Sequence, residues 1–266
     1  MTNTKANFRI CFAFIFILPF IFWALWFVFS ESTIMNIMKD AAENHFLEIE
    51  IRGFKKGFLY DLFIDEVIIK SGQEEIMTLN NINSRINPFK LLIKNLDMSV
   101  ESDSKKGKIK GFISLSKKNT NGKLEFKDLD LTALSFLGKR KIKGSGNISG
   151  SLIFNNSESH IEFISRNLSL EDIEISGIKT PASFFHSMSG AININNNLIN
   201  IESVSFDGKN VYARLRGCVK DYIADATLEI MPDKNFTDNH LLFAGLEQYR
   251  VSPGYYLIPL KGEFPI

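Results

Sequence analysis

The sequence predicts a mainly β protein: a curved antiparallel sheet of repeated, glycine-punctuated strands with a few short helices, preceded by one N-terminal transmembrane helix. An unbroken apolar run, ICFAFIFILPFIFWALWFVF, occupies residues 10–29. After residue 45, apolar and polar residues alternate in one segment after another, and similar segments recur along the chain. Alternation with a period of two leaves one face of a strand dry and the other wet, which is typical of antiparallel sheets.

The apolar run has the length of a membrane span. At about 1.5 Å of helical rise per residue it would cover about 30 Å, the thickness of the hydrocarbon core of a bilayer. Because a spanning backbone must satisfy its own hydrogen bonds, we expect a transmembrane helix over residues 10–30. A cleaved signal peptide is the alternative, although its apolar region would be shorter and Val28-Phe29-Ser30 is a poor cleavage site.

The charges on either side of this run predict its orientation. Lys5 and Arg9 precede the run, whereas residues 31–50 hold one lysine and five acidic residues. By the positive-inside rule, residues 1–9 form a cytoplasmic tail, and the chain after the span lies on the opposite side of the membrane. Trp23 and Trp26 stand near the far end of the run, where amphipathic rings suit the membrane interface.

A short juxtamembrane helix is predicted over residues 31–45. Apolar residues recur there at helical spacing, and Ser32 or Thr33 could cap the start of the helix. The predicted apolar face consists of Ile34, Ile37, Met38, Ala41 and Ala42. The period then changes to two, so residues 46–266 are expected to form the β-repeat domain.

Strands and turns follow from the alternation and from the residues that interrupt it. The predicted strands include residues 47–52, 96–101, 148–154, 211–215 and 224–230, and residues 255–266 are expected to form a last, proline-broken edge strand. Clusters of Asn, Asp and Gly separate strands, and these residues tolerate the positive φ that hairpin turns require. The predicted turns lie at residues 119–122, 155–157, 195–197 and 207–208.

Glycine-led strand pairs recur. Gly107, Gly146 and Gly190 each precede a strand, a turn and a second strand, and these glycines are 39 and 44 residues apart. A period of this size indicates an array in which each unit buries its apolar face against the next unit.

Short helices predicted between strands, at residues 131–138, 181–188 and 238–248, could plug one end or face of the curved sheet. The phenylalanines expected in such plugs are Phe136, Phe184, Phe185 and Phe243. If the sheet closes on itself or is capped, its apolar face is core. If the sheet stays open, that face could hold lipid acyl chains or the surface of a partner.

No pattern of catalytic, cofactor-binding or metal-binding residues is recognisable, so we expect a protein that is not an enzyme and carries no cofactor. Carboxylates within residues 61–66 are interpreted as charges on the wet face of a strand, and Cys218 as a small core residue. The net charge of +1, with Lys and Arg spread along the chain, gives no electrostatic footprint for nucleic acid. The four histidines show no metal-ligand spacing; they are His45, His160, His186 and His240.

The order of the segments resembles a known family. After the span come GFLYDLFIDEVIIKSGQEEIMTLNNINSRINPFKLL, GKIKGFISL, LSFLGKRKIKGSG, GNISGSLIF, SGAININNNLINIESVSFDGKNVYARLRGCV and YYLIPLKGEFP. This order resembles the type II secretion system protein N family and, more broadly, the AsmA-like β-repeats of bacterial envelope proteins. The resemblance implies a single-pass protein of the bacterial inner membrane with a periplasmic β-rich domain, and it brings no catalytic residues. The chain departs from many relatives in being rich in Asn, Lys and Phe.

Two functional hypotheses follow. The first is a component of a type II protein secretion apparatus whose periplasmic domain contacts other secretion-machinery proteins. The alternative is an AsmA-like lipid-binding or lipid-transfer protein, in which an apolar β trough holds phospholipid or lipopolysaccharide acyl chains. The predicted span makes the membrane a partner in both hypotheses, and neither includes nucleic acid.

Overall fold

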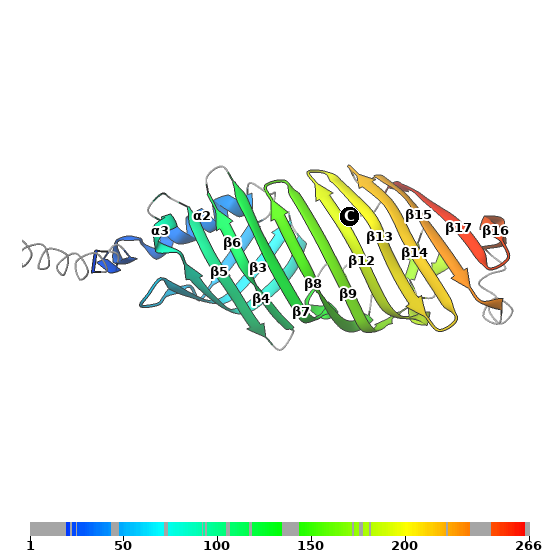
Figure 1. Cartoon of the computed structure of the whole chain (residues 1–266), viewed down its shortest axis with the longest axis horizontal. Helices are drawn as coiled ribbons and strands as arrows, with labels where there is room; N and C mark the ends of the chain where they lie inside the picture. The colour runs from blue at the N-terminus through cyan, green and yellow to red at the C-terminus, as the bar shows by residue number, and fades with distance from the viewer. Residues whose placement is uncertain are drawn as a thin grey trace, which may run out of the picture.

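A computed structural model describes residues 20–21, 23–24, 26–43, 48–71, 74–91, 93, 95–104, 107–116, 119–134, 144–171, 173–175, 178–180, 182–221, 223–234 and 246–263. Within these residues the chain forms one large antiparallel sheet of 15 strands, which does not close, and a small two-stranded sheet (Figure 1). The predicted fold class of a mainly β protein with a few short helices is therefore confirmed.

The predicted membrane span lies mostly outside the described residues. Residues 20–21, 23–24 and 26–28 are helical. Among all described residues, no helix is both long enough and apolar enough to cross a membrane. The span and its orientation stay predictions.

The elements follow one another along the chain in a simple order. They are α2 (Glu31–Glu43), β1 (Glu48–Arg52), β2 (Lys55–Lys56), β3 (Asp61–Ser71), β4 (Glu74–Ile86), α3 (Pro88–Leu91), β5 (Leu96–Ser104), β6 (Gly107–Leu115), β7 (Thr120–Asp130), η1 (Leu131–Ala133), β8 (Gly144–Asn155), β9 (Glu158–Leu170), β10 (Ile173–Ile175), β11 (Ile178–Thr180), η2 (Ala182–Phe184), β12 (Phe185–Asn195), β13 (Leu198–Gly208), β14 (Val211–Lys220), β15 (Ile223–Pro232), η3 (Glu247–Tyr249), β16 (Arg250–Ser252) and β17 (Tyr255–Glu263).

Strands that are neighbours in sequence are mostly neighbours in the sheet. The order is β1-β3-β4-β5-β6-β7-β8-β9-β12-β13-β14-β15-β17-β16, with β2 paired to β3, while β10 and β11 form the small sheet. Every pairing is antiparallel, so the large sheet is a meander that runs along the long axis of the molecule (Figure 1). The expected last edge strand is instead covered on one side by β16, which pairs with Tyr255 and Tyr256.

The predicted strands are confirmed wherever their residues are described, and so are the turns at Asn156 and Asn196, whose φ values are 51° and 50°. Other turns are displaced. Strand β7 begins at Thr120, within the turn predicted at residues 119–122. Strand β13 continues to Gly208, so the turn predicted at residues 207–208 lies at Lys209 and Asn210 instead.

The displacement at Gly122 has a packing reason. A Cβ atom at Gly122 would lie 2.6 Å from Cζ of Phe154 on the neighbouring strand and 2.5 Å from the carbonyl oxygen of Phe112. The glycine therefore serves close approach between strands rather than a turn.

The three glycine-led segments form hairpins, but these pair edge to edge and do not bury their apolar faces against one another as the sequence predicted. Gly107 is the first residue of β6, Gly146 is the third residue of β8, and Gly190 lies in the middle of β12. Neighbouring hairpins continue the same sheet. Phe163 on β9, for example, is the cross-strand partner of both Gly150 on β8 and Gly190 on β12. The repeated unit thus adds strands to one sheet.

Candidate functional site: the inner face of the sheet

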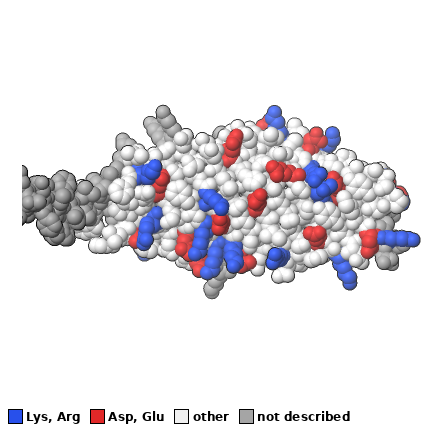
Figure 2. Space-filling model, in the orientation of Figure 1, with Lys and Arg blue, Asp and Glu red and all other residues white. Residues whose placement is uncertain are grey.

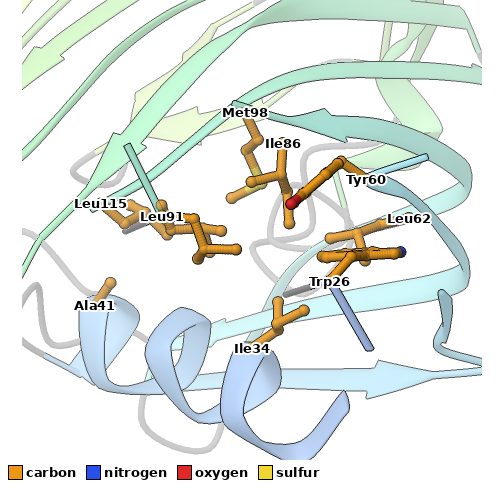
Figure 3. Packing of buried hydrophobic residues seen from close by; sticks show 10 residues of the cluster. Trp26, Ile34, Ala41, Tyr60, Leu62, Ile86, Leu91, Met98 and Leu115 are labelled. Atoms are coloured by element: carbon orange, nitrogen blue, oxygen red, sulfur yellow. The ribbon is translucent and has the colours of Figure 1, made fainter. Parts of the chain in front are cut away.

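The N-terminal end of the sheet is filled by the protein's own helices. Its inner face, the face that carries the buried apolar residues, contacts α2 and the residues just before it (Figure 3). Ile34 and Ala41 of α2 are buried there, as the predicted apolar face requires. The helix is capped differently from the expectation, because the backbone N–H of Thr33 donates to Oγ of Ser30 at 3.1 Å.

Trp26 is an unexpected member of this core. Its side chain is 0% exposed, its ring centroid lies 4.8 Å from that of Tyr60, and its Nε1 donates to the carbonyl oxygen of Gly57 at 2.8 Å. The sequence placed this ring at the membrane interface. The structure places it inside the β domain, because the end of the apolar run packs on the sheet.

Lys56 fastens the same junction from strand β2. Its Nζ donates to the carbonyl oxygens of Trp26, at 2.5 Å, and Phe29, and it lies 4.3 Å from the centroid of the Trp26 ring. These carbonyls end a helical segment and would otherwise lack partners. Burial lowers the pKa of Lys56, and the nearby Glu31 carboxylate opposes that effect.

The C-terminal end of the inner face is also filled. Leu246 and Tyr256 are 2% and 1% exposed and pack with Ile258 and Phe185. Phe184 packs against this cluster from η2. The helix predicted over residues 181–188 is wrong beyond that 3-10 turn, because Phe185 begins β12 and belongs to the sheet itself. The other two phenylalanines expected in plugs, Phe136 and Phe243, lie outside the described residues.

Between these ends, one part of the inner face is buried in a small cluster around Ile148, to which Leu131 of η1 contributes, and the rest is apolar but only half-buried. One row of side chains in cross-strand register crosses β7, β8, β9, β12 and β13. The row consists of Leu124, Leu152, Ile161, Ile192 and Ile201, each of which is half-buried. The next row adds Phe154, Ile194 and Ile199, also half-buried, with Ser159 of β9 between Phe154 and Ile194. We call these eight residues the central inner face.

The two ends and the central inner face differ in what contacts them. Toward the N-terminal end, Leu62 and Leu96 on the same face are 0% exposed beneath α2. Toward the C-terminal end, Ala226 and Leu228 on the same face are buried. Apolar side chains that are half-exposed in a continuous set are unusual in a folded core and typical of surfaces that contact another apolar body.

The outer face of the sheet is mostly polar, and many of its charges are paired. Figure 2 shows acidic and basic side chains scattered over the face of the sheet that is turned to the viewer. The cross-strand pairs on it are mostly exposed, and the least exposed joins Arg214 Nη2 to Glu229 Oε2 at 2.5 Å. The bond to Glu229 raises the pKa of the Arg214 guanidinium. Alternation of face along each strand thus holds as the sequence predicted.

A groove on this outer face, about 750 Å³ in volume, is rich in lysine. Its walls include Lys108, Lys110 and Lys123, which bond to Asp103, Glu101 and Glu125 at 2.7–2.9 Å. These pairs neutralise most of the positive charge.

The residues weighed as possible site residues lie apart from one another. Asp61 bonds to Arg85 at 2.7 Å, as the wet-face interpretation requires. His160 Nδ1 lies 2.5 Å from Oδ1 of Asn193, and this hydrogen bond raises its pKa, with a further contribution from Glu162. His186 is exposed on β12, whereas His45 and His240 lie outside the described residues. Among described residues, no three His, Cys, Asp or Glu side chains could share a metal ion.

The interpretation of Cys218 as a core residue is wrong. Its cross-strand partners are Asn200 and Asp225, so it lies half-buried on the polar outer face. The parity of Val211 and Ala213, which are buried on the inner face of the same strand, already assigns position 218 to the other face.

Comparison with known proteins adds no identity. The sequence matches no protein-family model, no curated protein and no solved structure.

Proposed function

We propose that this chain is a membrane-anchored envelope protein that binds lipid acyl chains on the central inner face of its unclosed sheet. The observation that supports this proposal is the half-buried apolar surface of the eight residues of the central inner face, which lies among three buried clusters. Acyl chains are flexible and apolar, so they can follow a curved surface and need no fixed polar partner. Each buried methylene contributes about 0.8 kcal/mol, so burial of about ten carbons would contribute about 8 kcal/mol before the cost of association.

The proposed location of the protein follows from its apolar N-terminal run. The apolar run at residues 10–30 anchors the chain in the bacterial inner membrane by the part that precedes Trp26, which itself packs on the β domain. The N-terminus is cytoplasmic, and the β domain is periplasmic. The protein binds or hands over lipid and does not catalyse a reaction. Phospholipid and lipopolysaccharide both carry acyl chains of the required kind.

Lipid retention by the purified full-length protein tests the proposal. The inner-face double variant Ile161→Glu/Ile192→Glu places two charges on a cross-strand pair of the central inner face. The matched outer-face variant Ile153→Glu/Ile164→Glu changes the same residue type on strands β8 and β9, at positions that are 46% and 43% exposed.

Lipid extracted from each purified protein is measured by mass spectrometry, and far-ultraviolet circular dichroism verifies that the sheet is intact. We expect a defined lipid in near-stoichiometric amount in the native protein and the outer-face variant, and its loss from the inner-face variant. Equal lipid in both variants would refute the proposal.

A role in a type II secretion apparatus is the second candidate. Besides the resemblance in segment order, it is supported by apolar side chains that stand among the charges of the outer face: Phe63, Phe112, Ile153 and Ile164 are exposed there. Such residues suit a protein contact. Deletion of the gene would then reduce export of specific proteins without changing membrane lipid composition, and normal export would contradict this candidate.

A further inference from the structure

Exposed apolar side chains gather at the N-terminal end of the sheet, in two loops. Phe58 and Leu59, between β2 and β3, are 67% and 55% exposed. Phe89, in α3, and Ile93, just after it, are 65% and 64% exposed. Single exposed apolar side chains are ordinary, but a group of them at one place indicates an interaction surface.

The strand pairing brings the two loops together. Residue 61 begins β3, residue 86 ends β4, and residue 96 begins β5. Because these strands are antiparallel neighbours, the three points lie at the same end of the strands. The backbone N–H of Ile86 donates to the carbonyl oxygen of Tyr60 at 2.9 Å, directly beside the first loop. The N–H of Asn87, which begins the second loop, donates to the carbonyl oxygen of Asp97 at 2.8 Å.

The end of the apolar N-terminal run packs beside the same strand ends. The ring of Trp23 lies 5.8 Å from that of Phe58, and Trp26 packs beneath Tyr60. Phe27 and Val28, beside them, are exposed. In Figure 1 α3 and the helical residues before α2 lie at one end of the molecule, and β16 lies at the other.

We propose that the two loops form a membrane-docking surface that dips into the bilayer beside the anchor. The partner is the lipid surface itself, because the loops continue the apolar surface of a run long enough to span a membrane. Exposed Phe and Leu side chains suit the boundary between headgroups and acyl chains. Lys55 and Lys90, both exposed, flank the loops and suit anionic headgroups.

Docking fixes how the sheet meets the membrane. Hydrogen bonds made by Lys56 and Trp26 already join the end of the helix to β2 and to Gly57, just after it. A second point of contact would hold this end of the inner face against the bilayer. The inference rests on the proposed anchor but not on lipid binding by the central inner face.

Site-specific quenching in the full-length protein tests the inference. With Cys11→Ala and Cys218→Ala as background, single cysteines replace Phe58, Phe89 or Val251 and carry an environment-sensitive fluorophore. Val251 is the matched control, because it is an equally exposed apolar residue (61%) in β16. The proteins are reconstituted in vesicles of phosphatidylethanolamine and phosphatidylglycerol, quenched either by nitroxide-labelled lipid or by aqueous iodide.

At positions 58 and 89 we expect quenching by the labelled lipid, at a depth of roughly 5–10 Å below the headgroup boundary, and protection from iodide. At position 251 we expect the reverse. Quenching by iodide at 58 and 89 to the level seen at 251 would overturn the inference, and protection from both quenchers would assign the loops to a protein contact and also overturn it.

Flotation of the same vesicles shows whether the protein is anchored in the membrane, independently of the quenching at the two loops. Protein that floats with the vesicles but shows no lipid quenching at 58 and 89 overturns the docking surface while leaving the anchor in place. Protein that does not float refutes the anchor and, with it, the docking inference.

Discussion

Replacing Trp26 by alanine should destabilise the whole β domain. Full burial of a tryptophan side chain removes about 150–250 Å² from water, or about 4–6 kcal/mol at about 25 cal/mol per Å². Alanine recovers part of that area, and the substitution also removes the hydrogen bond from Nε1 to Gly57, 2.8 Å long. We expect a loss of about 3–5 kcal/mol, the usual range for a large aromatic residue in a core.

Phe27→Ala is the matched control for this prediction. Phe27 is the next residue in the same helical segment, but it is 59% exposed, so its loss should change stability by less than about 1 kcal/mol. Both full-length variants are unfolded with urea in lipid nanodiscs and followed by the circular dichroism of the sheet. Equal, small losses for the two variants would refute the packing of the end of the apolar run against the sheet.

Other predictions test the sheet itself. Gly150→Ala should cost about 1–3 kcal/mol in urea unfolding, because its Cβ would lie 2.0 Å from a carbonyl oxygen of strand β9, whereas no loss would contradict the close approach. Arg214→Ala should lower the melting temperature more than the double variant with Glu229→Ala, since the single change leaves a largely buried carboxylate unpaired; equal losses would exclude coupling. The bond to Asn193 raises the pKa of His160 above 6.5, so its added stability is complete below that pH and is lost as pH rises through the raised pKa. His160→Gln should therefore reduce the fall in melting temperature between about pH 6 and pH 8, and an unchanged fall would contradict this role.

Much of the sheet could be predicted because its cause is local. Alternation along β5, β8, β14 and β15 specifies which side chains face inward, and the register keeps those faces aligned across the sheet. Turn positions were harder, because an Asn-Gly pair suits a turn and also suits a strand whose neighbour presses on the glycine. At Gly122 the ring of Phe154 decides between these states, and that contact joins residues far apart in sequence.

The junction at Trp26 shows a different kind of limit. A continuous apolar run has the same composition whether its last turn contacts lipid or a protein core. The partners that decide the case are Lys56 and Tyr60, and nothing local in the sequence links them to Trp26. The candidate site has the same character: alternation predicts an apolar inner face, but whether its centre is covered depends on the chain packed over it.

Site-specific photo-crosslinking on strand β8 tests lipid binding most directly. Phe154 belongs to the central inner face and is half-buried, whereas Ile153, the preceding residue, is 46% exposed on the outer face. p-Benzoylphenylalanine is placed at either position in the full-length protein, cells are irradiated, and adducts are identified by mass spectrometry. We expect lipid adducts at position 154 and few at position 153; equal lipid adducts at both positions, or none at 154, would contradict acyl-chain binding by the inner face.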